Sequence, residues 1–312
     1  MRSDGGVDQA EGLRRMLVLN QTQVITVVAG KAGVGRTSTA INLAAALAGF
    51  GKNVLVLDEN HGPDNLSGRM GLSARHDLLD VAQGMCGLCE AVLTAKGFCI
   101  LPTARAMRAL TELDQAVQQR LEDALTEASD GTDVVLVDAA MPALSLSERP
   151  ALGRAEGLAR QAMLVSPSMA SGAALLVMVE ATPSGITESY ALIKRLALKN
   201  ARQQFGIAVN KAGNEQAALT VFENMAKVAR RNLSVRLEYL GHVPTDERLD
   251  CALQLGRPVV EAFPSAASAK SYLELSQKLL RLPMQRDEVE GGVSAIIQNL
   301  IRQVSQPVAL AQ

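Results

Sequence analysis

The chain has few aromatic residues: no Trp, five Phe and three Tyr in 312 residues. Proteins that bind single-stranded nucleic acid stack bases on aromatic rings, so this scarcity argues against that class. Charge of one sign is also lacking, because 31 Lys and Arg oppose 32 Asp and Glu and leave a net charge of −1. Binding to a phosphate backbone needs clustered basic residues. A nucleic-acid partner is therefore disfavoured.

Cysteine and long apolar runs are scarce as well. Four cysteines are too few for a disulfide framework. The N-terminal residues MRSDGGVDQAEGLRRM contain no apolar core, so they do not predict a secretory signal. No apolar run approaches the roughly 18 residues of a membrane-spanning helix. At 48% hydrophobic residues the chain can nevertheless build a core, which excludes a disordered protein. We expect a cytoplasmic protein in a reducing compartment.

Short apolar runs alternate with helical segments from residue 21 onward. The runs predict strands at Val24–Ala29, Val54–Leu57, Val134–Val137, Leu175–Val179, Phe205–Val209 and Leu237–Leu240. Helices are predicted at Thr37–Ala48, near Met107–Ala116 and at Val117–Ala128. This alternation is typical of a doubly wound, mostly parallel α/β sheet, whose ligands lie at the carboxyl ends of the strands. The length allows one large domain or two domains of roughly 150 residues each.

A glycine-rich turn lies between the first predicted strand and the first helix. Glycines let successive backbone N–H groups point inward toward phosphate oxygens, and the helix N-terminus adds a positive dipole. Thr37 lies where a hydroxyl would bind Mg²⁺. The turn predicts a nucleotide-binding loop, and its candidate phosphate-binding residues are Gly30, Lys31, Gly33, Val34, Gly35, Arg36, Thr37 and Ser38.

The loop resembles the K-G-G-x-G-K-[ST] phosphate loop of the MinD/ParA ATPases. Lys31 matches the signature lysine, which in that family reaches the partner subunit's nucleotide in the active dimer. Arg36 replaces the lysine that contacts the β- and γ-phosphates, and a planar guanidinium is not equivalent to a compact ammonium. Ala32 replaces a glycine. The resemblance implies a MinD-like P-loop fold in a single domain, with a further strand at Ile100–Leu101.

Acidic residues that follow predicted strands extend the resemblance. Asp138 matches the family's magnesium carboxylate, which lies just outside the direct ligands of the ion, and Asp58 matches the first Asp of its D-x-D segment. Asn60 stands where the family has the Asp that helps to activate water, and an amide cannot take a proton. Pro142 replaces a glycine whose N–H would face the γ-phosphate. By resemblance, the catalytic residues are Lys31, Asp58 and Asn60, and the metal-site residues are Thr37 and Asp138.

The resemblance implies ATP or ADP with Mg²⁺ as cofactors and a homodimer that forms on ATP. The departures at Arg36, Asn60 and Pro142 all fall on the γ-phosphate side. They are compatible with a slow ATPase that has drifted harmlessly, and equally with an adaptor that binds nucleotide without hydrolysing it. A DNA-partitioning ATPase of the ParA type is a further alternative, against which the lack of basic character counts.

The second half is similar to the FlhG (FleN) group of flagellar-number regulators within this family. The similarity lies in Glu180–Lys194 and in Leu237–Pro264. It implies that the Asn210 amide reads the adenine edge and that Pro244 borders the base, although Asn210 could equally be a plain turn residue. Residues 8–16 match the group's D-Q-A-x-x-L-R segment, which implies that residues 8–17 stimulate an FlhF-like GTPase. Flagellar basal-body or transcription components are the other partners implied.

These features divide the chain into a partner-activating segment at residues 1–20, a MinD-like domain at 21–282 with an insertion at about 141–170, and a C-terminal helix at 283–312. Apolar residues from Val293 to Val304 recur at helical spacing and form one stripe. The stripe could bind the inner face of the cell membrane or pack back onto the protein. Its polar face carries only Arg302, so attraction to anionic lipid is weak.

Two remaining clusters have less specific patterns. Cys86 and Cys89 form a CxxC pair, but a zinc site needs four ligands and only Cys99 and His76 lie near in sequence. We expect these cysteines to pack against a helix. The basic residues Lys194, Arg195, Lys199 and Arg202 are expected on a solvated helix face.

Overall fold

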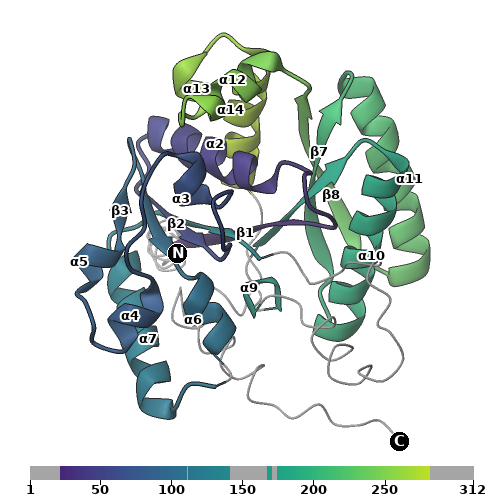
Figure 1. The fold of residues 1–312 in the computed structure, drawn as a ribbon. Coiled ribbons are helices and arrows are strands. Elements are labelled where there is room, and N and C mark those ends of the chain that lie inside the picture. Colours follow the sequence, from purple (N-terminus) through teal and green to yellow (C-terminus); the bar gives the residue numbers. More distant parts are fainter. Residues whose placement is uncertain (1–21, 111, 141–166, 171–173, 282–312) are drawn as a thin grey trace, which may run out of the picture.

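The computed structural model describes residues 22–110, 112–140, 167–170 and 174–281 (Figure 1). Three predictions lie wholly or mostly outside these residues: the partner-activating segment at 1–20, the insertion at about 141–170, and the C-terminal helix at 283–312. Pro142 is also outside. Of the insertion, the structure describes the short helix α9, Pro167–Ala170, in which Met169 is fully buried.

The described residues form one eight-stranded sheet in the order β3-β4-β2-β5-β1-β6-β7-β8. Only β3 runs antiparallel to its neighbour. The strands are β1 Gln23–Ala29, β2 Val54–Asp58, β3 Leu93–Thr94, β4 Cys99–Pro102, β5 Val134–Asp138, β6 Ala174–Glu180, β7 Gln204–Ala212 and β8 Arg236–Pro244. All seven predicted strands are present, and each is one to five residues longer than predicted. The doubly wound, mostly parallel α/β fold is confirmed.

The longer helices connect successive parallel strands or follow the last one. They are α2 Arg36–Gly49, α7 Gln115–Ser129, α10 Pro183–Asn200, α11 Glu215–Leu233 and α14 Ala267–Leu279. The shorter helices are α3 Leu66–Arg69, α4 Leu78–Ala82, α5 Leu88–Ala91, α6 Ala104–Ala109, α12 Glu247–Gln254 and α13 Val259–Ala262.

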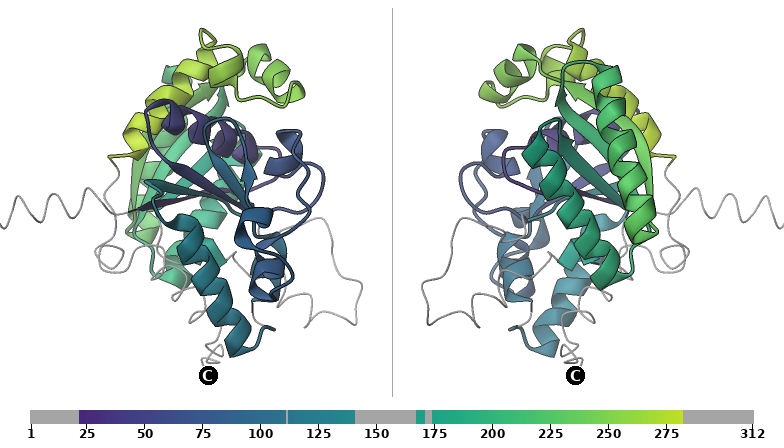
Figure 2. Two further views of the ribbon diagram at one scale, coloured as in Figure 1. Left: turned by 90° about the vertical axis from the view of Figure 1, so that its left-hand side faces the viewer. Right: turned by 90° about the vertical axis from the view of Figure 1, so that its right-hand side faces the viewer.

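Helices cover both faces of the sheet (Figures 1 and 2). On one face, α2, α13 and α14 pack in a core that includes Ile25 and Val27 of β1. On the other face, α4, α6 and α7 pack over β2, β4 and β5, and α10 and α11 pack over β6 and β7. Strand β1 lies at the centre and is buried along its whole length. Two-sided burial explains why the parallel strands read as continuous apolar runs.

Two details differ from the sequence predictions. The helix expected near Met107–Ala116 ends at Ala109, and the next helix begins at Gln115 because the Asp114 carboxylate accepts a hydrogen bond from the Val117 N–H at 2.8 Å. Such a side-chain cap fixes where a helix begins. Arg202 was expected on a solvated face, but it is buried and lies after the end of α10. Lys194 and Lys199 are exposed as predicted.

Candidate nucleotide-binding site

The glycine-rich turn connects the central strand β1 to the N-terminus of α2. Gly35 is the residue before α2 and has a φ of 96°, a backbone conformation that favours glycine. A Cβ atom at Gly35 would lie 2.3 Å from the Asn210 side-chain nitrogen. A Cβ at Gly30 would lie within 2.5 Å of the backbone of α10. Glycine is thus required at both positions, because neighbouring elements approach the turn so closely.

Asn210, in β7, holds the turn in place. It is 4% exposed, and its Nδ2 donates to the Val34 carbonyl oxygen at 2.6 Å. Its Oδ1 accepts from the Lys211 N–H at 2.9 Å. Both ends of the amide therefore bind the protein itself in this structure. Recognition of the adenine edge by Asn210 stays a prediction.

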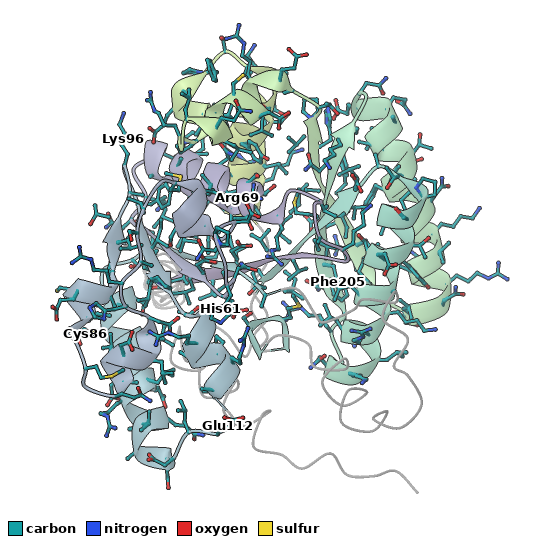
Figure 3. All side chains as sticks on the ribbon, viewed as in Figure 1. His61, Arg69, Cys86, Lys96, Glu112 and Phe205 are labelled. Carbon is teal, nitrogen blue, oxygen red and sulfur yellow. The ribbon has the colours of Figure 1, made fainter. Side chains whose placement is uncertain are left out.

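A pocket of about 550 Å³ lies along the turn, within the size range of small-molecule sites. It contains all but one of the predicted cofactor-binding residues: Lys31, Gly33, Val34, Gly35, Arg36, Thr37, Ser38, Asn210 and Pro244. Gly30 lies behind the turn against α10. The remaining walls come from the loop after β2, from α3 and from α12. His61 and Arg69, labelled in Figure 3, belong to the first two of these walls.

An acidic pair lies behind Arg36 and Asn60, two residues that line the pocket, where β2 and β5 end. The strand register places Asp58 directly beside Asp138, although 80 residues separate them in sequence. Both are almost completely buried, with exposed fractions of 1% and 0%. Asp58 accepts hydrogen bonds from the N–H groups of Leu66 and Ser67 at the start of α3. These two hydrogen bonds hold the first turn of α3 against the end of β2.

Asn60 connects the two carboxylates. Its Nδ2 donates to Asp58 Oδ1 at 3.2 Å, to Asp138 Oδ2 at 2.9 Å and to the Asp138 carbonyl oxygen at 2.9 Å. Its Oδ1 accepts from Nη2 of Arg36. An aspartate at position 60 could accept from Arg36 but could not donate to either carboxylate. The network therefore needs an amide at this position.

Arg36 supplies the positive charge of this cluster. Its Nε lies 2.6 Å from Asp138 Oδ1, and the arginine is only 9% exposed. A buried acid pair next to a buried arginine is stable only when most donors and acceptors are matched. One donor is left over: Nη1 of Arg36 is buried and has no hydrogen-bond partner within the described part of the chain.

The environment of Asp58 shifts its acidity. Burial, and next the negative charge of Asp138, raise the pKa of Asp58 to about 6, although hydrogen bonds from Asn60 and Leu66 oppose the shift. A strongly perturbed carboxyl at the end of a pocket is typical of functional sites.

Lys31 lies at the mouth of the pocket and is paired within its own chain. Its Nζ forms an ion pair with Glu180 Oε2 and donates to Ser184 Oγ at 3.1 Å. Lys211 Nζ binds the other oxygen of Glu180 at 3.0 Å and also donates to the Gly33 carbonyl oxygen. Hydrogen bonds from Lys31 and Lys211 hold the pKa of Glu180 below its usual range. Glu180 thus connects both lysines to the end of β6.

The predicted catalytic and metal residues separate into two groups. Asp58, Asn60 and Asp138 come together with Arg36 at the ends of β2 and β5, and Lys31 lies with Glu180 at the end of β6. Sequence reasoning did not identify Glu180 and Lys211 as part of the site. Glu180 is the last residue of β6, just as Asp58 and Asp138 end their strands. The rule that ligands bind at the carboxyl ends of parallel strands could have identified it.

The acidic cluster does not fit a magnesium ion as it is arranged here. One oxygen of Asp138 binds Arg36 and the other binds Asn60, so a metal ion at this carboxylate would have to compete with both side chains. Metal ligands must offer free oxygen lone pairs. Thr37 lines the pocket at the first turn of α2, but Asp138 could join it as a ligand only after Arg36 had moved.

Among the residues that the structure describes, no group of three or more His, Cys, Asp or Glu side chains is arranged to hold a metal ion. Cys86 packs against the core as predicted and lies away from His61 and Arg69 (Figure 3). The same prediction was wrong for Cys89, which is exposed in α5. Within the same ranges no helix has the length and apolar character needed to span a bilayer.

The fold and the pocket define a class of protein. Residues 25–259 match the family model of the CobQ/CobB/MinD/ParA nucleotide-binding domain. The chain belongs to this family, as the resemblance of its phosphate loop predicted.

Individual relatives show which members of this family the chain is similar to. The chain is 32% identical to the antiactivator FleN of Pseudomonas aeruginosa over 291 residues, which cover 92% of this chain and 98% of FleN. It is 27% identical to the flagellum site-determining protein YlxH of Helicobacter pylori, over 73% of this chain and 71% of YlxH. Among solved structures it is similar to the septum site-determining protein MinD of Pyrococcus horikoshii complexed with Mg-ADP. That structure has a TM-score of 0.56 and 23% identity, and the match covers 82% of this chain and 95% of MinD.

Proposed function

We propose that this chain is a nucleotide-binding regulator of flagellar number or placement, of the FlhG/FleN type, with ATP or ADP as its ligand. One observation carries the proposal: the turn from Lys31 to Ser38 lines a pocket of about 550 Å³ at the carboxyl end of β1. The near full-length similarity to the antiactivator FleN supports a regulatory role over a metabolic one. Backbone N–H groups and the N-terminus of α2 would bind the phosphates.

The proposed regulator dimerises on ATP and acts on an FlhF-like GTPase through residues 8–17. Flagellar basal-body or transcription components are further proposed partners, and residues 293–304 would bind the membrane surface or pack on the domain. The position of Lys31 supports dimerisation, because a lysine at the mouth of the pocket with a side chain 31% exposed could reach a second subunit. For it to do so, the ion pair with Glu180 would have to open.

Hydrolysis is proposed to be slow. The amide of Asn60 cannot accept a proton from water, and its oxygen already binds Arg36. The same observation favours a second candidate, an adaptor that binds nucleotide and never cleaves it.

The test compares the full-length wild type with the double variant Arg36→Lys/Asn60→Asp. Calorimetry measures nucleotide affinity, and phosphate release measures turnover. We expect tight binding by both proteins and slow turnover by the wild type. Turnover found only in the double variant would support the adaptor, whereas measurable wild-type turnover unchanged in the variant would exclude it. Failure of the wild type to bind any nucleotide would refute the proposed function.

Two deletions test the terminal segments. Removal of residues 1–20 should abolish stimulation of an FlhF-like GTPase and leave nucleotide affinity unchanged. Removal of residues 291–312 should abolish co-sedimentation with anionic lipid vesicles if the C-terminal stripe binds membranes. Co-sedimentation that persists after the deletion would remove membrane binding from the proposal.

A further inference from the structure

Arg36 occupies an unusual position for a residue at the start of a phosphate-binding helix. Its side chain lines the pocket and is more than nine-tenths buried. Two of its three nitrogens are used within the protein, by Asp138 and Asn60. The third, Nη1, is buried without a partner among the described residues. An unsatisfied buried donor is destabilising, so a ligand that accepts from it is favoured once the side chain shifts enough to expose Nη1 to the pocket.

The net charge of the network around Arg36 determines which ligand charge is favoured there. Asp58 and Asp138 bring two carboxylates, Arg36 brings one positive charge, and Asn60 brings none. Within these four residues one negative charge is left in excess, and the buried carboxylate of Glu59 lies beside them. The MinD/ParA pattern, with Lys at position 36 and Asp at position 60, would leave two in excess at the same four positions. A divalent cation matches the second arrangement, whereas a single guanidinium already offsets much of the first.

Guanidinium geometry allows one arginine to bind two anions at once. It presents five N–H donors in a planar fork and remains protonated at every physiological pH. Here Nε and Nη2 bind the cluster, which fixes the plane of the group and leaves Nη1 for another acceptor. A lysine ammonium could not bind two residues of the cluster in this fixed way.

We infer that Arg36 is the resident cation of this site and that the pocket binds a nucleoside diphosphate without a divalent metal. The inference rests on the proposed nucleotide-binding function. Nη1 of Arg36 donates to a phosphate oxygen while Asp138 and Asn60 hold the rest of the guanidinium. The substitutions at positions 36 and 60 are then one coupled change, since Asn60 is the residue that joins Arg36 to both carboxylates.

The experiment measures the affinity of the full-length chain for ADP by calorimetry, once in MgCl₂ and once in EDTA. We expect the wild-type affinities in the two buffers to differ by less than about threefold. The variants Asn60→Asp and Arg36→Lys/Asn60→Asp should bind ADP at least about tenfold more weakly in EDTA than in MgCl₂. Thermal melting of each protein shows that it is folded.

Arg120→Lys is the control, because Arg120 is an exposed arginine that lies outside the pocket and donates from Nε to the Ala82 carbonyl oxygen. It should bind ADP as the wild type does in both buffers. A loss of threefold or more by the wild type in EDTA would overturn the inference and leave the proposed function standing. Variants as insensitive to EDTA as the wild type would overturn the role of Arg36 and Asn60. No ADP binding in either buffer would overturn the proposed function, and the inference with it.

Discussion

Removing the Arg36 guanidinium should destabilise the fold even when no nucleotide is present. In Arg36→Met, Asp138 keeps its buried position but loses the only cation that the structure places on it. Asp58 remains at its side as a second carboxyl group. Breaking a buried ion pair by removing one partner costs about 3–5 kcal/mol, because the remaining charge is left without a counter-charge. Methionine preserves much of the side-chain volume, so the loss reports charge more than packing.

Urea unfolding at pH 7 in EDTA measures this loss in free energy. Arg120→Met is the control, and it should cost only about 1 kcal/mol, the usual contribution of one hydrogen bond. The double variant Arg36→Met/Asp138→Asn should recover part of the loss, because the unpaired charge is gone. If Arg36→Met costs no more than the control, or if Asp138→Asn recovers nothing, the ion pair does not stabilise the acidic cluster as reasoned here.

Three further predictions concern the rest of the pocket. Gly35→Ala should cost about 1–3 kcal/mol of unfolding free energy and weaken nucleotide binding, because the new Cβ would lie 2.3 Å from the Asn210 amide at a φ of 96°; an unchanged melting temperature would contradict this. Because two lysines lower the pKa of Glu180 from 4.5, its ion pairs stabilise the fold above that pH and are lost as the pH falls below it. Glu180→Gln should therefore cost about 1 kcal/mol at pH 7 and progressively less as the acid pH falls through the lowered pKa of Glu180, measured by urea unfolding, whereas a cost that does not fall with pH would rule out the charge effect. Asp246→Ala should lower the free energy of unfolding by about 1–2 kcal/mol, since the Asp246 carboxylate accepts hydrogen bonds at the start of α12 and from Ser268. A smaller loss, measured by calorimetric melting, would mean that water replaces these hydrogen bonds.

Much of the fold can be read from local sequence patterns. The parallel strands are buried on both faces, so they appear as β-branched runs such as Val24–Ala29. The two-residue strand β3 has no such run, and it forms only because it pairs with β4. The end of α6 was also missed, because the Asp114 cap that starts the next helix is a single side-chain contact and not a periodic pattern.

Some residues of the candidate site could likewise be predicted from local sequence patterns, and others could not. The turn from Gly30 to Ser38 is contiguous, so its glycines and its place between a strand and a helix predicted a phosphate-binding loop from sequence alone. The partners of its side chains are distant in sequence. Glu180 is 149 residues from Lys31 and reaches it only because β6 pairs with β1. No local pattern could have given that contact.

The sequence by itself determined the class of fold, the phosphate loop and the departures from the family pattern at Arg36 and Asn60. It presented those two residues as separate losses on one side of the site. Only the tertiary structure decided that they act together, because the register of β2 and β5 brings Asp58 and Asp138 side by side. The Asn60 amide binds both carboxylates, and the Arg36 guanidinium binds Asp138 and Asn60. Strand pairing, and not sequence distance, sets which charges must balance.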